Sequence, residues 1–185
     1  MIKYIKKINI ITLLIVHVLI LNFNARAEST IKAMAILDQK HSTIKGTIYF
    51  TNKIEGPTSI TGKIEGLFPG KYGFHIHEKG DISSGCKSAG GHYNPTNQAH
   101  GTINNGHVGD LGNIISQSSD GLVKIDLTAA RIKLYGEFSV VNRTIMIHGK
   151  EDDLGKKNNE GSKKTGNAGP RIGCGIIKII HNSKP

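Results

Sequence analysis

Six imidazoles and one carboxylate recur along the sequence at spacings that suit metal binding. His75 and His77 lie two residues apart in an apolar segment, and alternate residues of a strand point to one face, so both rings could reach one ion. Asp110 follows His107 by three residues, and the remaining donors are His92, His100 and His148. A structural zinc ion takes four ligands, and imidazole suits copper and zinc alike. Seven donors therefore predict two metals that share one imidazole.

The prediction of a metal site rests on the whole set of donors rather than on any single histidine. Each histidine taken singly would be interpreted as a solvent-facing or hydrogen-bonded loop residue. Their recurrence beside a carboxylate favours a metal site. Two further histidines, His41 and His181, lie away from these segments and are interpreted as surface residues.

The donors require a framework that brings distant segments together. Runs rich in Ile, Val and Leu alternate with Gly and Pro turn signals, and no stretch shows a sustained helical period. The expected strands are residues 31–37, 44–52, 59–65, 72–77, 122–127, 132–134, 144–148 and 174–180. Many short strands separated by turns predict an all-β sandwich or barrel.

Two long segments interrupt the strands, residues 78–109 and 149–173. Connections of this length are uncommon in compact domains and usually carry function. The cysteines, Cys86 and Cys174, lie in the first segment and directly after the second. In an exported chain two cysteines predict one disulfide, worth about 4–5 kcal/mol by loop-closure entropy.

The N-terminus has the pattern of a secretory signal peptide. A basic start precedes an apolar run over residues 8–21, and Ala25-Arg26-Ala27 matches the small-x-small cleavage pattern. The apolar run is shorter than the roughly 20 residues that a membrane-spanning helix needs. We therefore expect residues 1–27 to be removed. Residues 28–185 would form one exported domain, periplasmic or extracellular, without stable membrane association.

The charge of the remaining chain has two interpretations, an ordinary soluble basic surface or a surface that attracts a small anion. Removal of four basic residues with the leader lowers the formal net charge from +10 to +6. The chain has no arginine-rich cluster and no interleaving of basic and aromatic residues, which argues against nucleic-acid binding. A basic surface can steer an anionic substrate to a site. Lys150, Lys163 and Lys164, in the second long segment, are the candidates for such steering.

Several long motifs resemble those of the copper/zinc superoxide dismutases. The chain carries GFHIHE from residue 73, CKSAGGHYNP from 86, GHVGDLG from 106, DDLG from 152, KTGNAG from 164 and GPRIGCG from 169. The resemblance covers about residues 31–180. It implies an eight-stranded Greek-key β-barrel with two long functional loops, and one copper and one zinc ion per subunit. It also implies conversion of superoxide to dioxygen and hydrogen peroxide, and protection against oxidative damage. The family contains both dimers and monomers, and we expect a homodimer here.

The resemblance also assigns roles to individual residues. The copper ligands would be His75, His77, His92 and His148, and the zinc ligands His92, His100, His107 and Asp110. His92 would thus bridge the metals and take part in proton transfer. Arg171 would orient the anionic substrate, Asp152 would link His75 to His100, and Cys86 would pair with Cys174.

Two positions depart from common patterns of that family. Gly149 follows His148 where many relatives carry Glu, so one acidic member of the steering network is missing. Asn142 replaces a common Gly near the family's dimer contact, and Asn also tolerates a left-handed backbone. The sequence Asn142-Arg143-Thr144 is a glycosylation sequon, which we interpret as unused.

Three alternatives compete with an active dismutase. A copper-delivery protein on the same fold would often lack metal ligands or the arginine, and a copper-only enzyme would lack part of the zinc set. A structural β-sandwich with a chance histidine cluster would not respond to chelators. All seven donor positions and Arg171 are present, which favours the enzyme.

Overall fold

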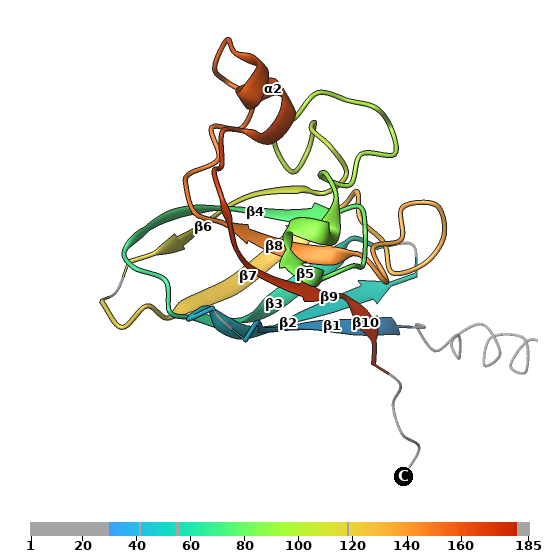
Figure 1. Ribbon diagram of the computed structural model, residues 1–185. Helices are drawn as coiled ribbons and strands as arrows, with labels where there is room; N and C mark the ends of the chain where they lie inside the picture. Colours follow the sequence, from blue (N-terminus) through green and yellow to red (C-terminus); the bar gives the residue numbers. More distant parts are fainter. Residues whose placement is uncertain (1–29, 41, 55, 118, 181–185) are drawn as a thin grey trace, which may run out of the picture.

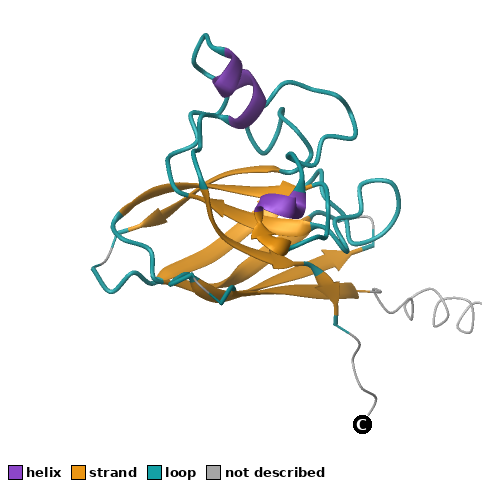
Figure 2. Cartoon of the chain, in the orientation of Figure 1, coloured by secondary structure: helices purple, strands orange, loops and turns teal. Residues whose placement is uncertain are grey.

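The computed structural model describes residues 30–40, 42–54, 56–117 and 119–180, which form two antiparallel β-sheets (Figure 1). The all-β prediction is therefore confirmed, and the short helices lie in the loops (Figure 2). The expected signal peptide, His41 and His181 lie outside the described residues. None of the helices described has the length and apolar character required to cross a membrane.

The first sheet has five strands in the order β10-β1-β2-β3-β7. Their bounds are β1 Thr30–Asp38, β2 Lys45–Lys53, β3 Thr58–Glu65, β7 Val123–Ala129 and β10 Lys178–Ile179. Alternation sets which face is buried. In β3, Ile60 and Ile64 are fully buried, whereas Thr61 and Lys63 between them are exposed.

The second sheet has four strands in the order β6-β4-β8-β9. Their bounds are β4 Gly70–His77, β6 Asp110–Ser116, β8 Thr144–His148 and β9 Arg171–Ile176. The chain passes to this sheet between β3 and β4, returns between β6 and β7, and passes across again before β8. Such exchanges between sheets are the connections of a Greek-key sandwich.

The apolar faces of the two sheets enclose the core. It is dominated by aliphatic side chains and two phenylalanines, among them the fully buried Ile48, Phe50, Ile60, Phe74 and Ile145. This matches the composition, in which tryptophan is absent and only 5% of residues are aromatic. The core therefore supports one face of the second sheet and leaves the other face available to the loops.

One predicted strand is wrong, and the seven-residue strand β6 was missed, as was the shorter β5, Ser83–Cys86. Residues 132–134 form no strand, and only Lys133 makes an isolated bridge, to Ser139. Strand β6 was missed because Gly112 has a left-handed φ of 85° and the pairing of β6 with β4 shifts register. Such a bulge breaks the two-residue alternation by which strands are recognised.

The two long connections carry short elements that were not predicted. The first contains β5, Ser83–Cys86, and the 3-10 turn η1, Lys87–Ala89; the second contains α2, Glu160–Thr165. Helix α2 is too short to show a helical period. The Asn159 side chain caps its start by accepting a hydrogen bond from the Ser162 amide, and Gly166 ends it with a φ of 63°.

The predicted disulfide is present and fixes the first loop to the second sheet. It joins Cys86 to Cys174 across 88 residues of sequence. Cys174 is fully buried with Ala89 and Met146 in a small cluster behind the loop. The C-terminal strand prediction began too late, because β9 starts at Arg171, and it overlooked the break at Ile177 between β9 and β10.

Burial in the core predicts which side chains lower the stability of the fold when they are shortened. We expect Ile60→Ala to lower the free energy of unfolding by about 2–5 kcal/mol, because a fully buried side chain would leave a cavity between the sheets. The measurement is denaturant unfolding of the metal-free, disulfide-bonded protein. Ile115→Ala is the matched control, since Ile115 is 51% exposed, and should cost less than about 1 kcal/mol. Equal losses would contradict this view of the core.

Candidate metal centre

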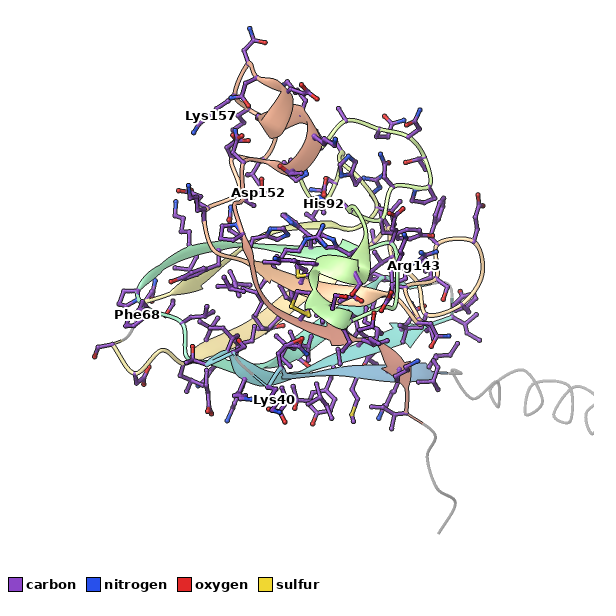
Figure 3. The ribbon with its side chains drawn as sticks, viewed as in Figure 1. Lys40, Phe68, His92, Arg143, Asp152 and Lys157 are labelled. Atoms are coloured by element: carbon purple, nitrogen blue, oxygen red, sulfur yellow. A yellow bond between two sulfur atoms is a disulfide. The ribbon has the colours of Figure 1, made fainter. Side chains whose placement is uncertain are left out.

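Strands β4 and β8 place three imidazoles on the outer face of the second sheet. Phe74 and Ile76 point into the core, so His75 and His77 point the other way, as the spacing predicted. β8 pairs with β4, and His148 at its end lies beside them. All three histidines are buried because the long loops cover this face. Figure 3 shows His92 and Asp152 between the sheet and these loops.

Backbone carbonyls orient two of these rings. His77 Nδ1 lies 2.9 Å from the Gly90 carbonyl oxygen, and His148 Nδ1 lies 3.1 Å from that of Gly169. Each Nδ1 therefore donates its proton, and each Nε2 keeps a free lone pair. The two Nε2 atoms are 3.2 Å apart. Two lone pairs at this distance suit a shared cation.

In His75 the two ring nitrogens have the opposite roles from those in His77 and His148. Its Nε2 lies 2.9 Å from Asp152 Oδ2, so Nε2 donates and Nδ1 carries the lone pair. Within the described part of the chain this buried Nδ1 has no hydrogen-bond partner. Buried polar atoms are normally paired, so the orphaned nitrogen fits a metal ligand. It lies in the same group as His77, His92 and His148, whose ligand atoms all fall within 4.8 Å of one another.

The first loop and β6 supply a second group of donors. Asp110, the first residue of β6, lies among three ring nitrogens: His92 Nδ1 at 2.9 Å, His100 Nδ1 at 3.0 Å and His107 Nδ1 at 3.2 Å. The amides of Gly101 and His107 donate to Asp110 Oδ2 and fix the carboxylate. Three imidazoles and one carboxylate make a donor set that suits tetrahedral zinc.

His92 belongs to both groups. Its Nδ1 faces Asp110, whereas its Nε2 is buried and unpartnered among the residues described and belongs with the donors of the first group. Its ring centroid is 4.1 Å from that of His75. The donor set therefore fits two ions with His92 between them.

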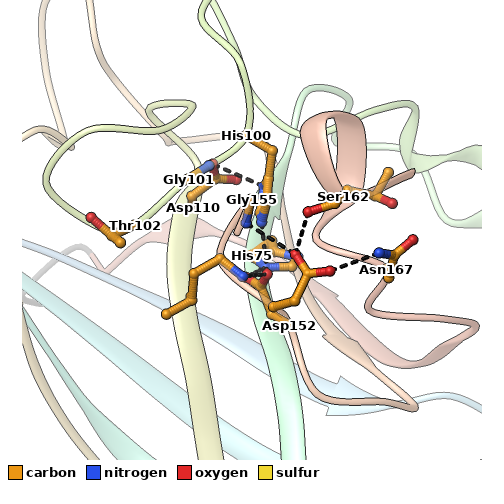
Figure 4. Close-up of polar contacts among 12 residues, drawn as sticks. His75, His100, Gly101, Thr102, Asp110, Asp152, Gly155, Ser162 and Asn167 are labelled. Carbon is orange, nitrogen blue, oxygen red and sulfur yellow. Dashed lines mark hydrogen bonds and ion pairs between the residues drawn. The ribbon is translucent and has the colours of Figure 1, made fainter. Parts of the chain in front are cut away.

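Asp152 contacts one ring from each of the two groups. Its Oδ1 lies 2.7 Å from His100 Nε2, and its Oδ2 accepts from His75 Nε2 (Figure 4). Asn113 on β6 holds the carboxylate in place, because its side chain makes two 2.8 Å hydrogen bonds to the Asp152 backbone. Carboxylates behind metal-binding histidines fix the tautomer and the ring orientation. Sequence reasoning missed Asn113, since no spacing marks it.

Burial keeps most of the rings neutral. Desolvation, aided by the charge of His92, lowers the pKa of His75 to about 3 and that of His77 to about 2. Desolvation also lowers the pKa of His148 to about 4, and it lowers the pKa of His92. Neutral imidazoles keep the lone pairs that a metal requires.

The carboxylates reverse this effect at His100. Burial opposes its charged form, but hydrogen bonds and charge interactions with Asp110 and Asp152 prevail and raise its pKa to about 9. The pKa of Asp110 is held well below its usual range, since the three histidine contacts outweigh the burial that would raise it. The charges of protonated His100 and ionised Asp110 therefore balance each other, and a divalent cation bound by this group would replace the His100 proton.

A cleft of about 510 Å³ leads from the surface to the first group. Four of its lining residues belong to the donor groups, namely His77, His92, His107 and His148, and Arg171 from β9 also lines the cleft. The Arg171 guanidinium donates to the carbonyls of Cys86, Lys87 and Gly90. These bonds use three of its five N–H donors, which leaves two for a small anion in the cleft.

The three lysines proposed for steering are placed differently. Lys163 and Lys164 line the cleft, whereas Lys150 does not. The Lys163 ammonium donates to the Gly155 carbonyl at 2.5 Å, and its own carbonyl accepts from the His100 amide. Lys163 thus fastens the α2 loop to the second donor group. Lys164 is also exposed and lines the cleft.

The two departures from common patterns have local explanations. Asn142 adopts the expected left-handed backbone, with a φ of 61°, and its side-chain oxygen accepts a hydrogen bond from Lys178 Nζ. At Gly149 an added Cβ would lie 3.0 Å from Pro170 Cγ. A larger residue there would require Pro170 to shift.

Comparisons with known proteins agree with this geometry. The family model described as copper/zinc superoxide dismutase matches residues 44–177, a region that contains every candidate donor. Among solved structures, the crystal structure of a protein described as the clock protein EA4 is similar. It has 46% sequence identity and a TM-score of 0.76, and the match covers 80% of this chain and 94% of that chain.

The carboxylate between His75 and His100 gives a direct test of the donor geometry. We expect Asp152→Asn to lower the affinity for Zn²⁺ about 10- to 100-fold, because an amide cannot accept hydrogen bonds from both rings at once. The measurement is competition with a chromophoric chelator.

Asp126→Asn provides the control for this experiment. It makes the same chemical change on the exposed face of β7, outside the donor set, and should leave the affinity unchanged. Wild-type affinity in Asp152→Asn would show that Asp152 does not organise the site.

Proposed function

We propose that this chain, which belongs to the copper/zinc superoxide dismutase family, is an active dismutase that converts two superoxide ions and two protons into dioxygen and hydrogen peroxide. The observation that carries the proposal is the placement of His92 between two complete donor groups, at the floor of a cleft that also contains Arg171. The first group would hold copper and the second zinc.

The metals divide the work according to their chemistry. Bound copper supplies electron exchange with superoxide, and bound zinc, which has no redox chemistry, supplies a fixed charge. Everything else falls to the protein. The loops bury the donor rings and leave a cleft for approach, in which the anion would meet both Arg171 and His92.

Arg171 is suited to bind and orient the anion. Its guanidinium remains charged although partial burial lowers its pKa. Its bonds to three carbonyls hold the planar fork in one orientation, so little entropy is lost when a ligand binds. Lys164, which lines the cleft, adds positive charge that would raise the encounter rate at low salt.

His92 is suited to hold and release a proton. Its Nδ1 side is fixed by Asp110, whereas its Nε2 is unpartnered in the described structure and borders the cleft. A proton on Nε2 would lie where the reduced product needs it, and it could return from solvent through the cleft. General acid catalysis of this kind requires such proximity.

The arginine also separates the enzyme from a metal carrier. A carrier needs donors and access, but it has no use for an oriented cation beside them. The complete second donor group similarly favours a copper and zinc enzyme over a copper-only one. The similar protein is described only as a clock protein, and this description names no ligand or reaction, so it does not change the proposal.

Export and a homodimer remain part of the proposal. The disulfide suits an oxidising compartment, the periplasm or the extracellular space, and it agrees with the signal-peptide pattern of residues 1–27. For a dimer contact, Ile176 is partly exposed, whereas Ile177 is fully buried and Ile179 packs against the core.

The decisive experiment is superoxide dismutation with copper and zinc quantified in the same sample. Activity of the wild type should follow copper content. We expect Arg171→Met to retain both metals but to lose activity about 10- to 100-fold, because the anion loses its oriented cation. Arg171→Lys keeps the charge but lacks the planar guanidinium, so its activity should lie between those of the wild type and Arg171→Met.

Lys124→Met is the control, since it removes one positive charge from an exposed position on β7, outside the lining of the cleft. It should match the wild type. A fully loaded wild-type protein without activity would refute the enzyme and favour a metal carrier. Unchanged activity in a fully loaded Arg171→Met would refute the role of the arginine.

A further inference from the structure

Arg131 lies outside both donor groups, yet its side chain reaches the backbone that carries one of them. Its Nη1 donates to the Gly106 carbonyl at 2.5 Å and lies 3.4 Å from the His107 carbonyl. We propose that Arg131 is a positioning residue that holds His107 in the second donor group. The inference rests on the proposed function, in which that group binds zinc.

The backbone around Arg131 is a rigid support. The Ile132 carbonyl accepts a buried hydrogen bond from Thr58 Oγ1 of β3, and the Leu134 amide donates to the buried side chain of Asn52. Ile132 and Leu134 are themselves buried in the core. Arg131 therefore extends from a segment that the first sheet anchors, although that segment is not a strand.

The Gly106–His107 peptide, whose carbonyl accepts this hydrogen bond, has little room to rotate. Gly106 is buried, and an added Cβ would lie 2.3 Å from Asp110 Oδ2 and 2.5 Å from the Gly101 amide. Among the described residues, Arg131 is the only hydrogen-bond partner of the Gly106 carbonyl. Without the arginine this buried carbonyl would lose its partner, and the peptide would have to rotate toward water.

The two contacts hold His107 from opposite sides. Asp110 Oδ2 accepts from the His107 amide, whereas Arg131 binds the carbonyls of the same turn. The ring nitrogen of His107 lies 3.2 Å from Asp110 Oδ1, so a rotation of the turn would move it out of the group. Neither contact involves His75, His77 or His148. Loss of Arg131 should therefore weaken the second group and spare the first.

The test compares metal binding at the two groups in the full-length protein. Metal-free wild type, Arg131→Met and Arg131→Lys are titrated with Co²⁺, whose visible absorption reports four-coordinate geometry, and separately with Cu²⁺. We expect Arg131→Met to weaken Co²⁺ binding about 10- to 100-fold and to alter the absorption bands. The affinity for the first equivalent of Cu²⁺, which the first group should bind, should change less than about twofold. Arg131→Lys, which can still reach one carbonyl, should show a smaller loss of Co²⁺ affinity.

Lys124→Met again controls for charge, and denaturant unfolding of each metal-free variant controls for stability. An Arg131→Met protein with wild-type Co²⁺ affinity and absorption would overturn the inference. So would equal losses of Co²⁺ and Cu²⁺ affinity that follow a loss of stability, because that pattern indicates a structural role alone. A wild type that binds Co²⁺ without four-coordinate absorption would instead refute the proposed zinc site.

Discussion

The structure depends on one constraint, that a single imidazole must present one nitrogen to each of two donor groups. His92 meets it because Asp110 fixes its Nδ1 edge while its Nε2 edge is left unpartnered at the floor of the cleft. A bridging ring can tolerate little rotation, because any movement that improves one group worsens the other. Other contacts around the site serve to prevent that movement.

Three successive sets of contacts provide this rigidity. The core immobilises β4 and β8, which carry His75, His77 and His148. The disulfide and Arg171 fasten the first loop to β9. Asp152 then joins the rings of the two groups, and Asn113 holds Asp152. A Greek-key sandwich suits this design, because it presents a buried sheet face on which two long loops can close.

Spacing along the sequence indicates the candidate donors but not the contacts that support them. The two-residue spacing of His75 and His77 determines a shared strand face, and the carboxylate that follows His107 lies in the same turn. In contrast, the Gly90 and Gly169 carbonyls and the Arg131 contact are made by backbone brought together only by folding, so no side-chain pattern reveals them. Strand β6 was hidden by the bulge at Gly112. Lys163 was a steering candidate because of its charge alone, whereas its ammonium donates a hydrogen bond to a carbonyl of the same loop.

The shared imidazole can be tested most directly by magnetic resonance. Both donor groups would be loaded with Cu²⁺, and the electron paramagnetic resonance signal would be compared with that of protein carrying Cu²⁺ in one group and Zn²⁺ in the other. A bridging His92 predicts that the two Cu²⁺ ions couple, so that the signal departs strongly from the sum of two isolated ions. Two independent signals at full double loading would contradict a shared His92 and, with it, the two-metal arrangement of the site.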